Sequence, residues 1–304
     1  MKKAIVVGAN GYIGNDLVKE LLKNNIEVLA ITRLPDELFF KNFDKGQNLS
    51  HIRLDLKDVF LLSEKIAEKE WIVGEECVFY NFSWLGDKKL MDGTIENQLS
   101  NVTFLANSVK VASEIGCIKF INSGSIEETI AQNYLEQSWG KKFFLSGNDN
   151  YAISKIASRD MCKLLGYLYK IDYVHTRFSA VIDFNLNGTG YISNTIKSIL
   201  NGSNDFQYPS NENLFDIIDL KDLSKAYYLL GIYGKNKLDY FIGSGSPQKL
   251  NDYFDTFSNF KNSKEIIQKK QYKNTVDFNP ELLLRDTGLD LSNSFTNLLN
   301  KINL

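Results

Sequence analysis

The sequence contains few of the residues from which metal sites and disulfide frameworks are made. Its 304 residues include three cysteines and two histidines. Cys77, Cys117 and Cys162 are widely spaced, odd in number and without metal-ligand spacing, which is typical of buried thiols in a reducing compartment. His51 and His175 each lie in a strand-like run, so we expect them to be structural. With so few histidines, we expect no metal site.

The sequence also has neither an excess of one charge nor a long apolar run. Lys and Arg number 35 against 37 Asp and Glu, so the basic footprint of a nucleic-acid-binding protein is lacking. No apolar run approaches a membrane span, and the one after Met1 is far too short for a signal-peptide core. We therefore expect a cytoplasmic protein that binds neither nucleic acid nor membrane. Its 43% hydrophobic and 24% charged residues are ordinary for a globular protein.

A glycine-rich turn follows the first predicted strand, Lys3 to Val7, and leucines at helical spacing follow the turn. Glycine lets the backbone approach a pyrophosphate, while the start of a helix offers free N–H groups and a positive dipole end. The spacing is Gly-x-x-Gly-x-x-Gly, not the commoner Gly-x-Gly-x-x-Gly. The position between strand and helix nevertheless predicts a dinucleotide site. Its expected contacts are Gly8, Asn10, Gly11, Tyr12, Ile13 and Gly14.

The second predicted strand, Glu27 to Thr32, ends without the acidic residue that an NAD site usually carries for the ribose 2′-hydroxyl. Thr32 and Arg33 stand there instead. A hydroxyl and a guanidinium suit a 2′-phosphate, because arginine can bind phosphate through charge-assisted, bidentate hydrogen bonds. We therefore expect NADP (NADPH) as the cofactor, with NAD as the alternative.

Further strands alternate with helices through the first 180 residues or so. The predicted strands are 51–55, 77–82, 119–122 and 173–178, and the predicted helices are 59–70, 96–115 and one from residue 151. This alternation predicts a Rossmann-type, doubly wound α/β fold with a parallel sheet and right-handed crossovers. Ligands of such sheets lie beyond the carboxyl ends of the strands. The residues expected at that edge include Asp55, Leu56, Phe82, Ser83 and Ser125.

The chain loses its periodicity from Ile126 to Asn150, and a long irregular stretch in a compact domain is more often functional than idle. We predict a flap that faces the substrate. After Asp183 the chain becomes rich in Asn, Gly and Ser. We expect a dinucleotide-binding domain of residues 1–182 plus about 214–243, and a smaller C-terminal α+β substrate-binding domain of about 183–213 plus 244–304.

Tyr151 and Lys155 open a helix and lie on one face of it, because residues four apart are neighbours on a helix surface. We expect Asn150 to be the N-cap. A lysine cation beside a tyrosine hydroxyl favours the phenolate and so lowers the tyrosine pKa from its reference value of roughly 10. The expected buried stripe of this helix is Ile153, Ile156, Met161, Leu164, Leu165 and Leu168. A second Tyr-x-x-x-Lys, from Tyr233 to Lys237, lies in a turn and is interpreted as coincidence.

Motifs along nearly the whole chain resemble those of the extended short-chain dehydrogenase/reductase family, a group that modifies nucleotide sugars. The shared motifs are the Gly8 turn, Asp55, Asn101, Ser125, Tyr151-x-x-x-Lys155, Asp216 to Leu223 and Tyr240 to Gly245. The resemblance implies that hydride moves between a sugar carbon and the nicotinamide. Tyr151 would pass a proton to or from the sugar oxygen, and Ser125 would hydrogen-bond that oxygen. A ketone that receives hydride becomes an alkoxide, which must be stabilised and protonated.

The resemblance also implies roles for residues around the reacting atoms. Lys155 would bind the nicotinamide ribose and lower the pKa of Tyr151, Asp55 would hydrogen-bond the adenine, and Asn101 would belong to the catalytic group. The family further implies a homodimer, formed by the helices that begin near Glu96 and Tyr151.

Departures from the family pattern affect the choice of reaction. Where the 4,6-dehydratases read Thr-Asp-Glu, this chain reads Ser125-Ile126-Glu127. Ile126 cannot donate a proton, so dehydration is disfavoured, and Glu127 is left as a substrate contact. Phe215 stands where many members bind the substrate diphosphate with an arginine. The substitute candidates are Lys141, Lys142, Arg177 and Lys197, with Trp84 and Trp139 as aromatic contacts for a base or sugar, or Trp84 as a core residue.

We predict an NAD(P)-dependent oxidoreductase, specifically an NADP-dependent reductase of a nucleoside-diphosphate 4-keto-6-deoxy sugar in surface-polysaccharide biosynthesis. The alternative is a nucleotide-sugar 4-epimerase with tightly bound NAD, because the same serine, tyrosine and lysine serve both reactions. A third alternative is a sensor that has kept the dinucleotide fold and lost the chemistry.

Overall fold

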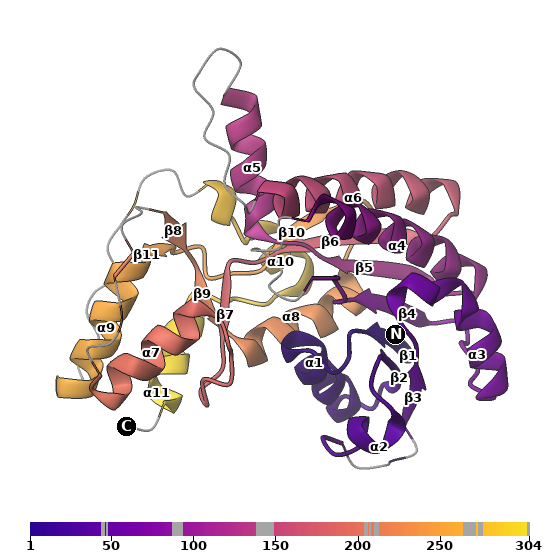
Figure 1. The fold of residues 1–304 in the computed structure, drawn as a ribbon, viewed down its shortest axis with the longest axis horizontal. Coiled ribbons are helices and arrows are strands. Elements are labelled where there is room, and N and C mark those ends of the chain that lie inside the picture. Colours follow the sequence, from indigo (N-terminus) through magenta and orange to yellow (C-terminus); the bar gives the residue numbers. More distant parts are fainter. Residues whose placement is uncertain are drawn as a thin grey trace. The chain divides into compact units, whose positions relative to one another are not determined.

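The computed structural model contains a seven-stranded sheet with the strand order β10-β6-β5-β4-β1-β2-β3 (Figure 1). The strands are β1 (Lys3–Val7), β2 (Glu27–Thr32), β3 (Leu49–Arg53), β4 (Cys77–Asn81), β5 (Lys119–Ser123), β6 (Asp172–Arg177) and β10 (Asp239–Phe241). β1 to β6 pair in parallel with their neighbours. The order 3-2-1-4-5-6 is that of the Rossmann fold. The predicted doubly wound α/β fold is therefore confirmed.

The structure describes residues 1–43, 46, 48–86, 94–137, 149–203, 206, 208–209, 213–263, 272 and 276–302. Trp139, Lys141 and Lys142, which were predicted as substrate contacts, lie outside the described residues. The chain divides into two units, Met1–Arg177 with Tyr227–Tyr240, and Phe178–Ala226 with Phe241–Leu304. The first division therefore falls after Arg177 and not after residue 182, because β7 pairs with a strand of the second unit.

Helices connect the strands of the sheet. They are α1 (Tyr12–Lys23), α2 (Asp36–Phe39), the 3-10 helix η1 (Leu56–Leu61), α3 (Leu62–Glu68), α4 (Ile95–Glu114), α5 (Ile126–Gln137), α6 (Asp149–Leu168) and α8 (Leu220–Tyr233). α5 corrects the prediction of an irregular flap, since the first half of that stretch is helical. Ser125 and Glu128 have the Ser-x-x-Glu spacing of a capping box, a start signal that does not depend on apolar periodicity.

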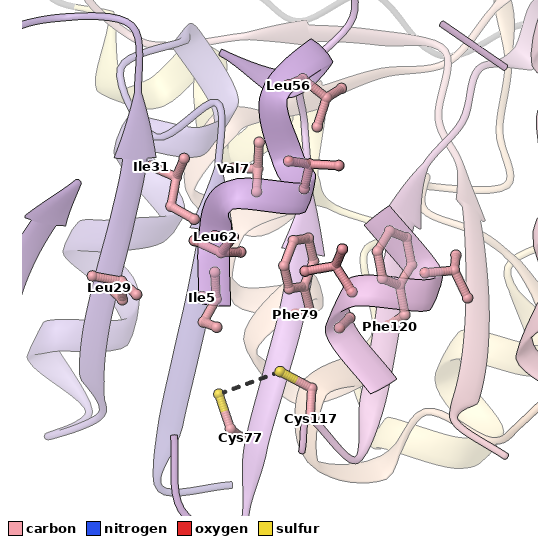
Figure 2. Packing of buried hydrophobic residues seen from close by; sticks show 14 of the residues in the cluster. Ile5, Val7, Leu29, Ile31, Leu56, Leu62, Cys77, Phe79, Cys117 and Phe120 are labelled. Carbon is pink, nitrogen blue, oxygen red and sulfur yellow. Dashed lines mark hydrogen bonds between the residues drawn. The ribbon is translucent and has the colours of Figure 1, made fainter. Parts of the chain in front are cut away.

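An apolar core fills the space between the sheet and the helices α3, α4 and α6 (Figure 2). Phe79 and Phe120 stack at its centre with ring centroids 5.0 Å apart. All three cysteines are buried, as predicted. The Cys117 thiol donates to Cys77 Sγ at 3.8 Å, and this bond, followed by burial, raises its pKa well above the usual value. A thiol held in its neutral form is a poor nucleophile.

A buried lysine attaches α8 to the sheet. Lys119 on β5 is 5% exposed, and its Nζ donates to the carbonyl oxygens of Leu230 and Gly231 at 3.3 and 3.0 Å. Burial lowers the pKa of this ammonium. A cation at the C-terminal end of a helix satisfies carbonyls that lack an intrahelical partner and matches the negative end of the dipole.

The outer surface of α6 corrects the predicted buried stripe. Ile153, Met161, Leu164 and Leu168 are 44%, 44%, 53% and 57% exposed. The residues that α6 buries instead are Tyr151, Ala152, Ser154, Lys155, Ser158, Arg159, Cys162 and Gly166. Several of these are small, which allows α6 to pack closely against α4. Asn150, the predicted N-cap, lies inside α6, which begins one residue earlier.

α4 shows the same inversion at its N-terminal end. Leu99 is 58% exposed, whereas Leu105, Val109 and Ala112, farther along the helix, are fully buried. Helical spacing identified the apolar residues of both helices but not the face that meets the rest of the chain.

The second unit combines two short strand pairs with helices. β7 (Ala180–Ile182) pairs in parallel with β9 (Ile217–Asp219), and β8 (Leu214–Phe215) pairs antiparallel with β11 (Gln248–Lys249). Its helices are α7 (Tyr191–Asn201), α9 (Leu250–Ser263), η3 (Val276–Phe278), α10 (Glu281–Thr287) and α11 (Ser294–Lys301). Its core includes Ile196, Phe254, Phe257, Phe295 and Leu298. In the part of the chain that the structure describes, no helix combines the length and apolarity that crossing a membrane requires.

Candidate active site

The turn between β1 and α1 has a shape that only glycine allows. Gly8 has a φ of +82°, in the left-handed region that favours glycine. A Cβ on Gly14 would lie 2.3 Å from the Gly8 carbonyl oxygen, and one on Gly11 would lie 3.2 Å from the same atom. Gly11 is the N-cap of α1 and supplies no side chain to its N–H groups. The turn therefore presents an uncapped helix start, which suits a pyrophosphate.

The other three residues predicted for this turn surround the helix start. Asn10 is exposed, and Tyr12 and Ile13 are half-buried in the first turn of α1. Their backbone follows the path that the glycines allow, so the predicted group is brought together in space.

A cavity of about 70 Å³ lies at the carboxyl ends of β2, β3 and β4. Its lining residues are Arg33, Asp55, Leu56, Ser83, Trp84, Leu85, Gly86 and Phe104. Asp55 is the N-cap of η1, where its Oδ1 accepts the N–H of Lys57 at 3.1 Å. Phe82 lies edge-on to Tyr227 at 4.8 Å. Residues from three separate strand ends thus line one small pocket at the edge where the sequence predicts the dinucleotide.

The Thr32 hydroxyl, predicted to contact a 2′-phosphate, is hydrogen-bonded inside the protein instead. Thr32 is 3% exposed, and its hydroxyl accepts the N–H of Leu34 at 3.1 Å and lies 2.9 Å from His51 Nε2. His51 Nδ1 is 2.6 Å from Asp36 Oδ1, so the ring proton lies on Nδ1 and Nε2 accepts from the hydroxyl. Burial lowers the pKa of His51 despite Asp36. The Thr32 side chain is therefore used inside the fold.

Arg33, in contrast, is exposed at the end of β2. Its carbonyl oxygen accepts a hydrogen bond from Arg53 Nε at 3.1 Å. Arg53 is the register partner of Thr32 on the neighbouring strand. Two guanidinium groups therefore stand at the edge where the sequence predicts a 2′-phosphate.

Ser125, Tyr151 and Lys155 meet beyond the carboxyl end of β5. Ser125 precedes α5, and its side chain hydrogen-bonds the Tyr151 hydroxyl. Tyr151 and Lys155 on α6 are 8% and 5% exposed. Lys155 Nζ donates to the carbonyl oxygen of Ser123 at 2.9 Å and lies 5.7 Å from the centroid of the Tyr151 ring. The structure thus brings together three residues that the sequence places in two separate segments.

The pKa of Tyr151 is raised, contrary to the expectation from Lys155. Burial of the ring is the largest cause and the Glu128 carboxylate the next, while the hydrogen bond with Ser125 acts in the opposite direction. The Lys155 ammonium is directed to the Ser123 carbonyl instead. Tyr151 is therefore held as a protonated phenol at neutral pH, which is the form that donates a proton.

Trp84 lies against this pair, a position that no local spacing predicts. Its ring centroid is 3.8 Å from Lys155 Nζ, and its ring is edge-on to Tyr151 at 5.7 Å. Its Nε1 donates to Gln98 Oε1 at 3.0 Å. The half-buried indole covers the ammonium in a cation–π contact. We had predicted Trp84 from the sequence as an aromatic contact for a ligand or as a core residue, and neither prediction included this contact with Lys155.

Asn101 holds the loop after β4 and does not supply a free catalytic group. It is fully buried in α4. Its Oδ1 accepts the N–H of Leu85 at 2.6 Å, and its Nδ2 donates to the carbonyl of the same residue at 3.0 Å. Both halves of the amide are thereby used, so the expected catalytic assignment of Asn101 is corrected to a structural one.

Two neighbouring glutamates in the first turn of α5 have different surroundings. The N–H of Glu127 donates to Ser125 Oγ at 3.2 Å, and burial, followed by Asp149, raises the pKa of its carboxyl. Glu128 is fully buried, and its Oε1 accepts the N–H of Ser125 at 2.8 Å. From the sequence we predicted Glu127 as a substrate contact and did not predict a role for Glu128, although the capping-box spacing from Ser125 to Glu128 could have indicated it.

Arg177 and Lys197, the remaining predicted substrate contacts, lie in different units. Arg177 Nη1 donates to Thr129 Oγ1 on α5, and Lys197 Nζ donates to the carbonyl of Gly188 at 3.5 Å. Their role in binding a diphosphate stays a prediction. Among the described residues there is no group of three or more His, Cys, Asp and Glu side chains that could hold a metal ion.

Comparison with known proteins places these features in context. Residues 4–243 match the model of the NAD dependent epimerase/dehydratase family. One relative is the dTDP-6-deoxy-L-talose 4-dehydrogenase (NAD(+)) of Aggregatibacter actinomycetemcomitans, 26% identical over 260 residues that cover 83% of this chain and 88% of the relative.

Two solved structures are similar in fold. The Bordetella bronchiseptica enzyme WbmG, in complex with NAD and UDP, has a TM-score of 0.71 at 16% identity, covering 99% of this chain and 94% of its own. The UDP-N-acetylglucosamine 4-epimerase from Methanobrevibacter ruminantium M1, in complex with UDP-N-acetylmuramic acid, has a TM-score of 0.74 at 19% identity, covering 99% and 96%.

The geometry of the glycine turn predicts the effect of a single methyl group. Gly14→Ala should weaken dinucleotide binding by roughly 10-fold or more, because its Cβ would meet the Gly8 carbonyl and displace the turn. The measurement is nicotinamide fluorescence on titration with the reduced dinucleotides. Gly190→Ala, where an added Cβ meets nothing within 4 Å, is the matched control. Equal affinities in the two variants would contradict the prediction.

Proposed function

Because the chain belongs to the NAD dependent epimerase/dehydratase family, we propose that it is an NADPH-dependent reductase that converts the 4-keto group of a nucleoside-diphosphate 4-keto-6-deoxy sugar to a hydroxyl, in surface-polysaccharide biosynthesis. Membership makes the chain an NAD(P)-dependent oxidoreductase of the extended short-chain dehydrogenase/reductase type. The contact between Ser125 and Tyr151, with Tyr151 held protonated, is the observation that carries the proposal.

Each residue of the site has a defined task in this reaction. When bound at the glycine turn and the Arg33 pocket, the dinucleotide supplies the hydride. Ser125 donates a hydrogen bond to the sugar oxygen as negative charge develops on it. Tyr151 gives that oxygen its proton and becomes a phenolate. The Lys155 ammonium, whose Nζ donates to the Ser123 carbonyl and lies 5.7 Å from the Tyr151 ring centroid, would bind the nicotinamide ribose.

Two observations support the reduced 4-keto sugar and NADPH. The 4-dehydrogenase relative is named for oxidation at position 4 of a 6-deoxy sugar, which is the reverse of the proposed reaction. Arg33 and Arg53 lie side by side at the ends of β2 and β3, and charge-assisted contacts from their guanidinium groups to a 2′-phosphate would favour NADPH.

A nucleotide-sugar 4-epimerase with retained NAD is the second candidate. It is favoured by the named cofactor of the 4-dehydrogenase relative, NAD(+). The same three side chains would serve it, with Tyr151 taking and then returning a proton. A sensor without chemistry is the weakest candidate, because Ser125, Tyr151 and Lys155 meet in one site.

The identity of the cofactor separates the first two candidates. Dinucleotide released by denaturation should be absent or substoichiometric, and the apo protein should prefer NADPH to NADH. Arg33→Ala should weaken NADPH binding by roughly 10- to 100-fold and leave NADH binding unchanged, because only the 2′-phosphate loses a partner. Lys110→Ala, which removes an exposed cation of α4, is the control. Tightly held NAD near one per chain would favour the epimerase instead.

Removal of the proton donor tests the chemistry itself. Tyr151→Phe should lower turnover of a panel of 4-keto-6-deoxy nucleotide sugars by roughly 100- to 10,000-fold, because the alkoxide loses its acid. NADPH oxidation followed by absorbance is the measurement, and NADPH affinity should stay nearly intact. Tyr167→Phe, which alters an exposed tyrosine of the same helix, should behave as the parent. Undiminished turnover in Tyr151→Phe would refute the assignment.

We further propose that two copies of the chain associate through α4 and α6. Leu99, Ile153, Leu164 and Leu168 are about half exposed on these two helices, and burying them would give the apolar contact of a stable dimer. Light scattering should give twice the chain mass of 34.7 kDa. Leu164→Glu should shift the protein toward the monomer, while Phe60→Glu, at an exposed residue of η1, should not. A monomeric parent protein would exclude this association.

A further inference from the structure

A buried carboxylate and a buried imidazole lie directly behind Ser125. Glu128 and His175 are both 0% exposed, and Glu128 Oε2 is 2.8 Å from His175 Nε2. The other carboxylate oxygen, Oε1, accepts the N–H of Ser125 at 2.8 Å. Burying a carboxylate is costly unless charge and hydrogen bonds compensate it. Here both oxygens have a donor, so the side chain is fixed from two directions.

The two partners of Glu128 come from different parts of the sheet edge. His175 lies in β6, whereas Ser125 follows β5. Gly124 leaves the space that the pair occupies, since a Cβ there would lie 2.4 Å from both Glu128 Oε1 and His175 Nε2. The glycine before the catalytic serine is therefore required by the buried pair.

A chain of hydrogen bonds determines which ring nitrogen of His175 carries the proton. Asn81, Asn122 and His175 are register partners on β4, β5 and β6. Asn81 Nδ2 donates to Asn122 Oδ1 at 3.3 Å, which leaves the Asn122 amide nitrogen 3.5 Å from His175 Nδ1. Nδ1 therefore accepts, and the proton on Nε2 is donated to Glu128.

The same chain reaches the loop that lines the cofactor pocket. Asn81 Nδ2 also lies 3.3 Å from the carbonyl oxygen of Ser83, a residue of that pocket. The buried polar groups thus run from the loop after β4 to the N–H of Ser125. Such connected networks restrict the positions of the groups at both ends.

The charge on Glu128 acts on the proton donor. Burial would raise the pKa of Glu128, but His175, Lys155 and the Ser125 N–H together hold it below its usual value, so the carboxylate is ionised at neutral pH. Its charge in turn raises the pKa of Tyr151. The charged and titratable groups that face Tyr151 are Glu127 and Glu128 from α5, Lys155 from α6 and, behind Glu128, His175 from β6.

We propose that Glu128 and His175 are a positioning pair for the reaction: His175 orients the Glu128 carboxylate, which holds Ser125 in place through its N–H. The inference rests on the proposed roles of Ser125 and Tyr151. Neither member of the pair touches the reacting atoms. Both act through residues that do.

Histidine NMR tests the geometry independently of activity. The chain has two histidines, so 15N-histidine labelling gives two ring systems. His175 should be the Nε2–H tautomer, whereas His51, whose Nδ1 faces Asp36, should be the Nδ1–H tautomer. Glu128→Gln should change the ring signals of His175 and leave those of His51 as an internal control. The proposed pair would be overturned by a proton on His175 Nδ1 in the unaltered protein, or by His175 ring signals that are unchanged in Glu128→Gln.

Kinetics test the positioning role. Glu128→Gln should lower kcat by roughly 10- to 100-fold, because a small displacement of catalytic groups has effects of this size. NADPH affinity should stay within about twofold of the parent value. The alkaline limb of the pH profile of kcat should move to lower pH, because the lost carboxylate no longer raises the pKa of Tyr151. Glu128→Asp keeps the charge, so its limb should stay near that of the parent.

A control variant separates positioning from stability. Lys119→Gln also removes a buried charge from the same region of sequence, at the other end of β5, and should lower stability while leaving the pH limb in place. A Glu128→Gln enzyme with parental kcat and an unmoved limb would refute the positioning role. If the parent protein turns over none of the 4-keto sugars, the proposed function fails, and the histidine tautomers still decide the pair.

Discussion

The parallel register of β1, β4, β5 and β6 is the constraint on which the site depends. Val7, Asn81, Asn122 and His175 are successive register partners across these strands, so the residues that follow them leave the sheet at one edge. The glycine turn, the Ser83 loop and Ser125 therefore lie along that edge, as expected for a parallel sheet. An antiparallel pairing would have sent alternate loops to opposite ends and separated the pocket from the serine.

This register also explains why the edge tolerates so many buried polar groups. Asn81, Asn122 and His175 are each no more than 1% exposed, and unsatisfied polar groups at such depth are destabilising. Their side chains meet one another because register partners lie side by side. The chain ends at Glu128, whose carboxylate accepts hydrogen bonds from His175 and from the Ser125 N–H and is further stabilised by the charge of Lys155. Ser125 and Tyr151 thus lie beside a connected group of buried polar side chains, while an apolar core packs against the strands of the sheet.

Helix α6 has a buried face and an exposed face, and both carry apolar residues. Helical spacing therefore predicted the helix and the Tyr151–Lys155 pair correctly but assigned the larger apolar residues to the buried face. Tyr151, Lys155 and Cys162 lie on its buried side, with small residues between them that allow α4 to approach. The larger apolar residues, such as Leu164 and Leu168, lie outward. A stripe of apolar residues indicates a surface that avoids water, but it does not state whether the same chain or a second copy covers it.

The sequence by itself determined the doubly wound α/β fold class and the glycine turn, and it identified Ser125, Tyr151 and Lys155 as candidate site residues. Each of these depends on local spacing or on the alternation of strands and helices. Only the tertiary structure placed Trp84 on Lys155 and Glu128 against His175. The tertiary structure also showed that the Thr32 hydroxyl is hydrogen-bonded to His51 and that Asn101 is hydrogen-bonded to the backbone of Leu85. These contacts join residues that are distant in the chain, and the pKa of Tyr151 follows from burial and from Glu128. Such effects arise from three-dimensional proximity, which residue spacing does not encode.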